Sequence, residues 1–260
     1  MSDATAYFER RDGSRFRATE HTGGAWREDE QHIAPALGLL VHVVEQDRRA
    51  RRDDGFVAGR LGYDILGTVP VAEVDAAVRV VRPGRTIELV EASLAHDGRT
   101  VVTLRAWLLE GRDTAEVAGT SVAPVPGPDV LPEWSPSQDW PGGFIGSVEL
   151  RRHLEEPGRG RFWARTPVPL LAGEEVSATA RAAGLFDIAN GMVMRADPAR
   201  VHFPNIDLTA HLLREPQGEW LGFDTTVTFG DGGLGLTSTR LHDADGPLGA
   251  VEQCLTVRPR

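Results

Sequence analysis

The chain has a single cysteine, Cys254, among 260 residues. One cysteine excludes an internal disulfide bond and any metal site built from several cysteines. Basic residues are also scarce relative to acidic ones, with 28 Lys and Arg against 38 Asp and Glu and a net charge of -10. Nucleic acids and anionic membrane surfaces bind to basic faces, so neither is expected as the main partner. Residues 1–17 hold no apolar run that acts as a signal or spans a bilayer, which favours a cytoplasmic protein.

Hydrophobic residues make up 41% of the chain, enough for a substantial core, and the second half repeats the layout of the first. In each half a glycine-containing turn leads into a strand-like run, a second turn and another strand-like run. Gly84 and Gly232 are separated by the same offset as Gly98 and Gly246. The repeat predicts two related units side by side, with the functional site where they meet.

Hydrophobic periodicity predicts the same elements in both halves. The apolar block 30–45 predicts a buried helix that ends at the charged run 46–54. Val-, Leu- and Thr-rich runs at hairpin spacing then predict a meander of antiparallel strands. These strands are expected at 56–66, 72–81, 85–94 and 99–109. In the second half we expect a hairpin, a helical block and a second meander, at 148–151 with 160–165, at 172–194, and at 205–214, 220–229, 234–241 and 248–257.

Proline and glycine concentrate in residues 123–143, a composition typical of linkers. The predicted units are therefore 1–122 and 144–260. Trp134 and Trp140 in this segment either cover a groove between the units or anchor the loop. The arginines of the N-terminal segment either meet the phosphates of a ligand or form a solvated arm. They are Arg10, Arg11, Arg15 and Arg17.

Taken in order, several segments resemble the acyl-CoA thioesterase II family and its thioesterase-like relatives. The stretch 31–37 resembles the family's Gln/His-Gly-Gly start of a helix without its glycines, and 81–85 resembles its Arg-x-Gly-Arg turn. The other matching segments are 148–151, 162–165, 185–187, 206–211 and Gln253 followed by Arg258. The resemblance implies an α+β fold, the double hotdog, in which two tandem units each have a long helix wrapped by a curled antiparallel β-sheet.

The resemblance also implies a catalytic set, in which an Asp, a Thr and a Gln hold and activate a water that attacks a thioester. The matching positions are Asp187, Asn205 and Gln253, with Asn205 standing where the family has Thr. Candidate substrate-binding residues are His32 at the start of the first helix, Gly191 as a backbone donor for the oxyanion, and Asp207. No cofactor and no metal are expected, because the histidines and carboxylates lack the spacing of a metal site.

These residue types suit attack of water on an acyl carbon. A carboxylate takes the proton of the water, and amide side chains orient it by hydrogen bonds. Asn205 offers both a donor and an acceptor, so an amide can replace the hydroxyl group. A covalent nucleophile is not expected, because no Gly-x-Ser-x-Gly elbow is present and Cys254 should point away from its neighbour Gln253.

Alternative interpretations remain open from the sequence. Asp187 in an apolar run also fits a buried, satisfied structural Asp, Asn205 a turn or cap residue, and Gln253 a surface position on a strand. A hotdog hydratase or dehydratase, a cyclase of a biosynthetic pathway, or a non-catalytic acyl-binding module would use the same fold. The expected partner is an acyl-CoA or acyl-carrier thioester, and we expect a homo-oligomer.

Overall fold

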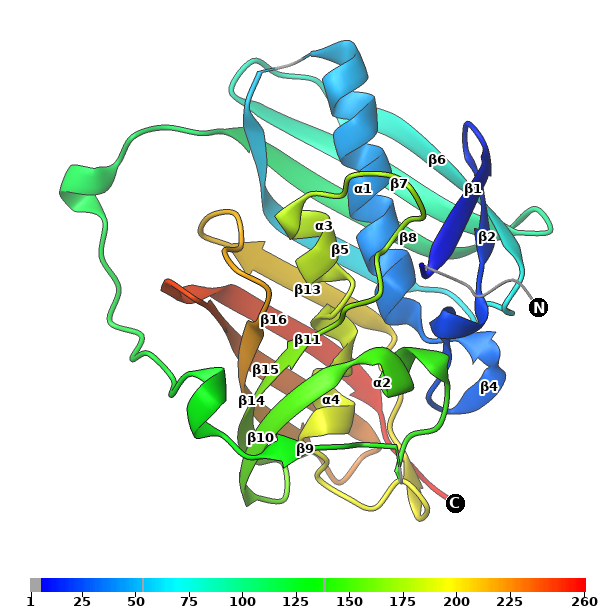
Figure 1. Ribbon diagram of the computed structural model, residues 1–260, viewed down its shortest axis with the longest axis vertical. Coiled ribbons are helices and arrows are strands. Elements are labelled where there is room, and N and C mark those ends of the chain that lie inside the picture. The colour runs from blue at the N-terminus through cyan, green and yellow to red at the C-terminus, as the bar shows by residue number, and fades with distance from the viewer. Residues whose placement is uncertain (1–5, 53, 138) are drawn as a thin grey trace.

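The structure is a computed structural model that describes residues 6–52, 54–137 and 139–260 (Figure 1). The start of the predicted polar N-terminus (1–5), one position of the charged run (53) and one of the predicted linker (138) lie outside the described residues. The strands of the first half are β1 (Phe8–Asp12), β2 (Arg15–Ala18), β3 (Gly23–Gly24), β4 (Arg27–Gln31), β5 (Phe56–Ile65), β6 (Glu73–Arg82), β7 (Ile87–His96) and β8 (Arg99–Glu110). Those of the second half are β9 (Glu133–Trp134), β10 (Glu149–Glu156), β11 (Arg159–Arg165), β12 (Val201–His202), β13 (Asp207–Leu212), β14 (Leu221–Phe229), β15 (Leu234–Asp243), β16 (Gly246–Thr256) and β17 (Arg258–Pro259). The helices are α1 (Ile33–Arg51), α2 (Gly143–Ser147), α3 (Ala178–Ala183) and α4 (Ala189–Met192), with 3-10 turns η1 (Glu20–Thr22), η2 (Ala115–Val117), η3 (Pro128–Val130) and η4 (Phe186–Ile188).

Thirteen strands of the described chain form one antiparallel sheet in the order β1-β2-β6-β7-β8-β5-β13-β16-β15-β14-β11-β10-β9. The order β6-β7-β8-β5 of the first half is mirrored by β13-β16-β15-β14 of the second. The halves join where β5 pairs with β13, with Gly62 opposite Thr209. Both predicted meanders are therefore present, and they share one continuous sheet.

The repeated glycines lie at equivalent hairpin turns of the two halves. Gly98, between β7 and β8, has φ 75°, and Gly246, the first residue of β16, has φ 101°. Residues with a Cβ atom rarely adopt positive φ, so glycine suits both turns. The equal spacing seen in the sequence thus places a glycine with positive φ at the same hairpin of each half, inside the turn in the first half and directly after it in the second.

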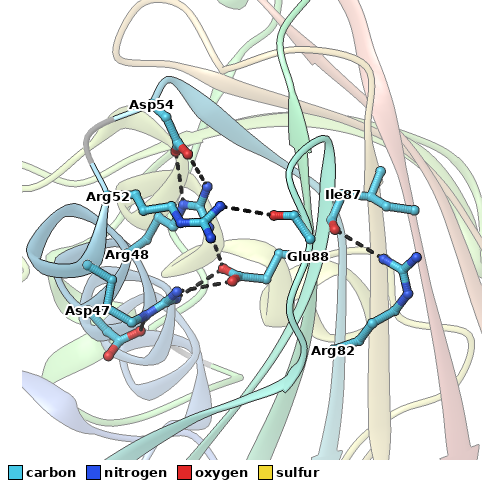
Figure 2. A network of polar contacts seen from close by, with 9 residues as sticks. Asp47, Arg48, Arg52, Asp54, Arg82, Ile87 and Glu88 are labelled. Carbon is cyan, nitrogen blue, oxygen red and sulfur yellow. Dashed lines mark hydrogen bonds and ion pairs between the residues drawn. The ribbon is translucent and has the colours of Figure 1, made fainter.

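Helix α1 crosses one face of the sheet in the first half, contacting β6 and β7 (Figure 1). The prediction that this helix ends before the charged run is wrong, because α1 continues to Arg51. Its last turns are tied to β7: Arg48 is only 5% exposed and donates to Glu88, which is 1% exposed. Figure 2 shows the guanidinium group of Arg48 between the carboxylates of Asp54 and Glu88. Paired charges therefore allow the charged run to remain helical against the sheet.

The second helical block, predicted as one element over 172–194, is instead three short pieces: α3, η4 and α4. Ser177 caps the start of α3 by accepting from the N–H group of Ala180, and Gly184 ends it. The apolar pattern continued through these breaks, so periodicity alone indicated a single helix. The break redirects the chain and places Asp187 on its own short turn.

Close packing of α1 against α3 depends on Gly38. A Cβ atom at this position would lie 2.6 Å from the carbonyl oxygen of Ala180 and 3.0 Å from the nitrogen of Gly184. Glycine inside a helix costs about 1 kcal/mol relative to alanine, yet here it lets two backbones touch. This contact brings the chain that follows α3 close to α1, and η4 also contacts α1.

The N-terminal segment is an ordered hairpin, which corrects the alternative of a solvated arm. Strands β1 and β2 pair with each other, and β2 pairs with β6. Arg10 donates hydrogen bonds to Glu174 at 2.6 Å and to Gln46 at 2.8 Å, and Arg15 donates to Asp75 at 3.0 Å.

The proline-rich segment between β8 and β9 runs outside the sheet (Figure 1). It is attached to β11 where the ring nitrogen of Trp163 donates to the carbonyl oxygen of Pro126. Among the described residues, no helix is both long enough and apolar enough to span a membrane.

Candidate active site

Asp187 lies on the single turn η4, between two side chains that anchor the turn in the core. Phe186 is 0% exposed and Ile188 1% exposed. Their burial holds the turn in place and leaves the carboxylate of Asp187, itself 6% exposed, at the edge of a cavity. A polar residue between two core residues therefore faces a hollow in the protein rather than bulk solvent.

The three residues implied by the resemblance come together. The Nδ2 atom of Asn205 donates to the Oδ1 atom of Asp187 at 2.6 Å, and the Nε2 atom of Gln253 donates to the same oxygen at 3.0 Å. Asn205 precedes β13 and bridges to Leu255, and Gln253 lies on β16 with 1% of its surface exposed. Residues far apart in the sequence thus converge on one carboxylate oxygen.

The hydrogen bonds fix which atoms remain available to a ligand. The Nδ2 atom of Asn205 also donates to the backbone oxygen of Asp207 at 3.0 Å. The backbone oxygen of Asp207 only accepts hydrogen bonds, as does the charged carboxylate of Asp187, so the amide of Asn205 turns its nitrogen toward them. The Oδ1 atom of Asn205 and the Oδ2 atom of Asp187 accept no hydrogen bond from any described residue. Two acceptors from residues that line the cavity are therefore left for a water molecule.

The environment of Asp187 makes its carboxylate a stronger base than usual. Burial raises the pKa of Asp187 to about 7, although the hydrogen bonds from Asn205 and Gln253 act to lower it. The cause is loss of hydration, which disfavours the charged form. A carboxylate with a pKa near neutrality can accept a proton from a reactant and later return it.

The cavity beside Asp187 has a volume of about 810 Å³, including its open mouth. Part of its lining comes from the second half, with Asp187, Gly191, Met192 and Asn205, and part from the first half, with residues 24–27 and 30–33 and the end of β5. Aromatic rings line it: Trp26 contacts Trp140 edge-on, with ring centroids 4.8 Å apart. A mostly apolar hollow with few convergent polar groups is typical of a small-molecule site.

His32 lies in the same cavity, at the start of α1. Its Nδ1 atom accepts from the backbone N–H group of Ala34 at 3.2 Å and so caps the helix. Burial lowers the pKa of His32 to about 3, so the ring is neutral at pH 7. Because Nδ1 accepts, the one ring proton must be on Nε2. His32 is therefore a neutral donor with a fixed tautomer, packed against Phe144 with ring centroids 4.4 Å apart.

The other predicted site residues have different positions. Gly191 lines the cavity, but its N–H group donates to the Oδ1 atom of Asn190 at 3.0 Å and its carbonyl oxygen accepts from Trp140 at 3.0 Å. Its N–H group is thus already engaged. The Oδ1 atom of Asp207 accepts from the backbone N–H group of Cys254 at 2.7 Å, which fastens β13 to β16, and Asp207 is not among the lining residues. Gln253 does not line the cavity either, although it donates a hydrogen bond to Asp187, which does.

Several wall residues were missed by sequence reasoning, namely Trp26, Gln31 and Asn190. Asn190 follows the predicted Asp187 by three residues, and that proximity was the available signal. Trp26 carries no motif, whereas Gln31 opens the stretch 31–37 that resembles the start of the family's helix, and that was the available signal. In the part of the chain that the structure describes, no group of three or more His, Cys, Asp or Glu side chains is placed to hold a metal ion.

Comparison with protein families gives two matches that together cover most of the chain. Residues 22–109 match the acyl-CoA thioesterase N-terminal domain, and residues 124–257 match the acyl-CoA thioesterase C-terminal domain. No curated protein matches the sequence.

Solved structures resemble the chain over almost its full length. A candidate thioesterase from Novosphingobium aromaticivorans is 20% identical with a TM-score of 0.74, covering 96% of this chain and 98% of that one. A protein of unknown function with a hot dog fold from Alicyclobacillus acidocaldarius is 18% identical with a TM-score of 0.74, covering 99% and 97%. An acyl-CoA thioesterase II from Mycobacterium marinum is 17% identical with a TM-score of 0.67, covering 97% and 96%. At these identities the likeness establishes the hotdog fold.

Proposed function

Because the chain belongs to the acyl-CoA thioesterase family, we propose that it hydrolyses an acyl-CoA or acyl-carrier thioester by direct attack of water, without a covalent intermediate. The observation that carries this proposal is the convergence of Asn205 and Gln253 on Asp187 at the wall of a cavity. We extend it to the architecture: residues 1–122 and 144–260 are two tandem hotdog units joined by 123–143, with the sheet curled around α1 in the first unit and around the short pieces α3, η4 and α4 in the second. The mirrored strand order supports this division.

In the proposed mechanism one water molecule lies between Asp187 and Asn205. It donates one hydrogen bond to the Oδ2 atom of Asp187 and the other to the Oδ1 atom of Asn205, the two acceptors left unused by the protein. Asp187 takes a proton as the water oxygen bonds to the thioester carbon. The tetrahedral intermediate then collapses, the carbon–sulfur bond breaks, and the proton passes from Asp187 to the leaving thiolate. Acid and free thiol are the products.

His32 is proposed to stabilise the oxyanion of that intermediate. Its Nε2–H group is a neutral donor whose tautomer is fixed by the helix cap, and His32 lines the cavity that Asp187 also lines. The start of a 19-residue helix adds a favourable dipole for developing negative charge. Donors fixed in advance cost no reorganisation during the reaction. This role replaces the donor expected from Gly191, whose N–H group is already engaged.

Substitution of His32 by Asn separates the proposed catalytic role from the helix cap. Asn is a favoured N-cap residue, so α1 should keep its start, but it lacks the Nε2–H donor. We expect kcat to fall on the order of 100-fold with little change in the thermal midpoint. His153→Asn, at an exposed position on β10, is the matched control and should leave kcat unchanged. Equal kcat for His32→Asn and the parent would contradict the assignment.

Release of free thiol tests the proposed reaction directly. Purified protein should release thiol from acyl-CoA substrates, and a series of short, medium and long acyl chains will define the preferred substrate. Native mass spectrometry on the same preparation detects acyl ligands that remain bound. Retained ligand without thiol release would instead favour an acyl-binding module.

The same experiment should also test hydration of an acyl thioester, because Asp187 and His32 line one cavity. A hydratase uses such a pair to add water to a 2-enoyl thioester. Loss of the ultraviolet absorbance of that conjugated thioester, with no thiol release, would identify hydration in place of hydrolysis. The fixed neutral tautomer of His32 favours hydrolysis, since the ring has no free basic nitrogen.

A further inference from the structure

Two buried polar side chains face each other on the inner surface of the sheet, behind the candidate site. Thr237 on β15 lies directly opposite Gln253 on β16. Thr237 is 0% exposed and Gln253 1% exposed. Directly opposed residues of antiparallel strands point to the same face, with Cβ atoms about 4.5–5.5 Å apart. Thr237 therefore lies beside the amide that supports Asp187.

Both side chains have an atom whose hydrogen bonding is incomplete. The Oε1 atom of Gln253 and the Oγ1 atom of Thr237 are buried and have no hydrogen-bond partner among the described residues. Buried polar atoms in proteins are nearly always paired, so two such atoms on opposed residues point to an interaction between them. A hydroxyl group donates and an amide oxygen accepts, and either a small rotation or one bridging water joins them.

We propose that Thr237 is a positioning residue for the hydrolysis: its hydroxyl group engages the Oε1 atom of Gln253 and thereby keeps the Nε2 atom on Asp187. The inference rests on the proposed function, because it assigns a role within the same site. Thr237 does not line the cavity, and its hydroxyl group makes no hydrogen bond to Asp187 among the described residues. It therefore acts through Gln253.

Loss of this hydroxyl group affects both ends of the Gln253 amide, because its oxygen accepts a hydrogen bond while its nitrogen donates to Asp187. Without Thr237 as donor, the buried oxygen of Gln253 is left without a hydrogen-bond partner, and the side chain gains by turning to find another one. Any such turn weakens the 3.0 Å hydrogen bond from Gln253 to Asp187. That hydrogen bond favours the charged form of the carboxylate, so weakening it raises the pKa of Asp187. The other titratable side chains that line the cavity are Arg27, Glu30 and His32, and burial and the two amides alone account for the shifted pKa of Asp187.

Thr237→Val tests the proposal, because valine has the shape of threonine without its hydroxyl group. The rise of kcat with pH should move upward by about one pH unit, roughly the effect of one hydrogen bond to a carboxylate. At pH 6.5 this shift corresponds to a several-fold loss of kcat, with KM little changed. Thr237→Ser restores the hydroxyl group and should restore the parental profile.

Thr239→Val is the matched control. Thr239 lies two residues along the same strand on the same face, is 1% exposed, and shares its hydroxyl hydrogen bond with Thr225 at 2.9 Å rather than with Gln253. Its pH profile should match the parent. An unmoved profile in Thr237→Val, or an equal shift in Thr239→Val, would overturn the proposal.

A measurement without turnover separates this inference from the proposed function. Carbon-13 NMR of the Asp carboxyl groups, with the signal of Asp187 assigned by its loss in Asp187→Asn, follows the titration of that group directly. The pKa of Asp187 should be higher in Thr237→Val than in the parent and in Thr237→Ser. This result would support the role of Thr237 even if no thioester were hydrolysed, and an identical titration would refute it even in an active enzyme.

Discussion

Asp187→Asn should lower kcat for thioester hydrolysis on the order of 1,000-fold and should at the same time make the protein more stable above pH 7. General base catalysis contributes about 10²–10⁴-fold, and Asn cannot accept the proton of the attacking water. The geometry should survive, because the Oδ1 atom of an Asn can accept from both Asn205 and Gln253 as the carboxylate does. The loss of rate would therefore report the lost base rather than a collapsed site.

The gain in stability follows from the direction of the pKa shift. The pKa of Asp187 is raised to about 7 in the folded protein, by burial, whereas an unfolded Asp titrates near 3.9. Between these pH values the folded protein keeps a proton that the unfolded chain releases. The contribution of Asp187 to stability is thus greatest below about pH 4 and is lost as pH rises through 7, by roughly 4 kcal/mol. Asn carries no charge to bury, so the variant avoids this loss.

Urea unfolding at pH 5 and pH 8, together with thiol-release kinetics, checks both effects. In the parent, kcat should rise with an apparent pKa near 7 and the free energy of unfolding should decrease over the same range. Asp224→Asn, which removes a partly exposed, ion-paired carboxylate on β14, should change neither kcat nor its pH dependence. Parental kcat in Asp187→Asn would rule out Asp187 as the base.

The resemblance to a family, rather than the residue pattern alone, grouped Asp187 and Gln253 in one predicted set. Their side chains do meet in the structure, although an apolar run and an alternating strand also fitted structural roles. The part that could not be predicted is which atom of each amide faces the carboxylate. For Asn205 that orientation depends on the backbone oxygen of Asp207, which accepts a second hydrogen bond from the same nitrogen.

Part of the opposite wall of the cavity was beyond sequence reasoning for a physical reason. His32 was predicted, but Trp26 lines the same cavity as Asp187 through packing between the halves, such as the contact of α1 with α3 at Gly38, which no local pattern encodes. The breaks between α3, η4 and α4 were missed likewise, since core burial continues through them and hides the change of direction. Strands were predicted better, because alternation and turn glycines are local signals.

Glu88→Ala should destabilise the protein by about 3 kcal/mol while leaving kcat unchanged. The carboxylate of Glu88 is buried and accepts hydrogen bonds from two arginines of α1. Arg48 donates at 2.7 Å (Figure 2), and Arg51 donates at 3.0 Å. Burial alone would raise the pKa of Glu88, but the hydrogen bonds from Arg51 and Arg48 lower it, so the group is charged at pH 7. Removing it leaves the buried guanidinium group of Arg48 with Asp54 alone. Breaking a buried ion pair from one side costs about 3–5 kcal/mol.

Glu91→Ala provides the matched control on the same strand, since Glu91 pairs with Arg79 and Arg105 at the surface. Exposed pairs contribute about 0–1 kcal/mol, so the urea midpoint of this variant should stay close to that of the parent. Activity should be spared in Glu88→Ala because a 19-residue helix is about 28 Å long and Glu88 contacts the end opposite His32. Equal destabilisation by both variants would show that the buried cluster does not fasten α1 to β7. A fall in kcat at temperatures where Glu88→Ala remains folded would show that the two ends of α1 are coupled.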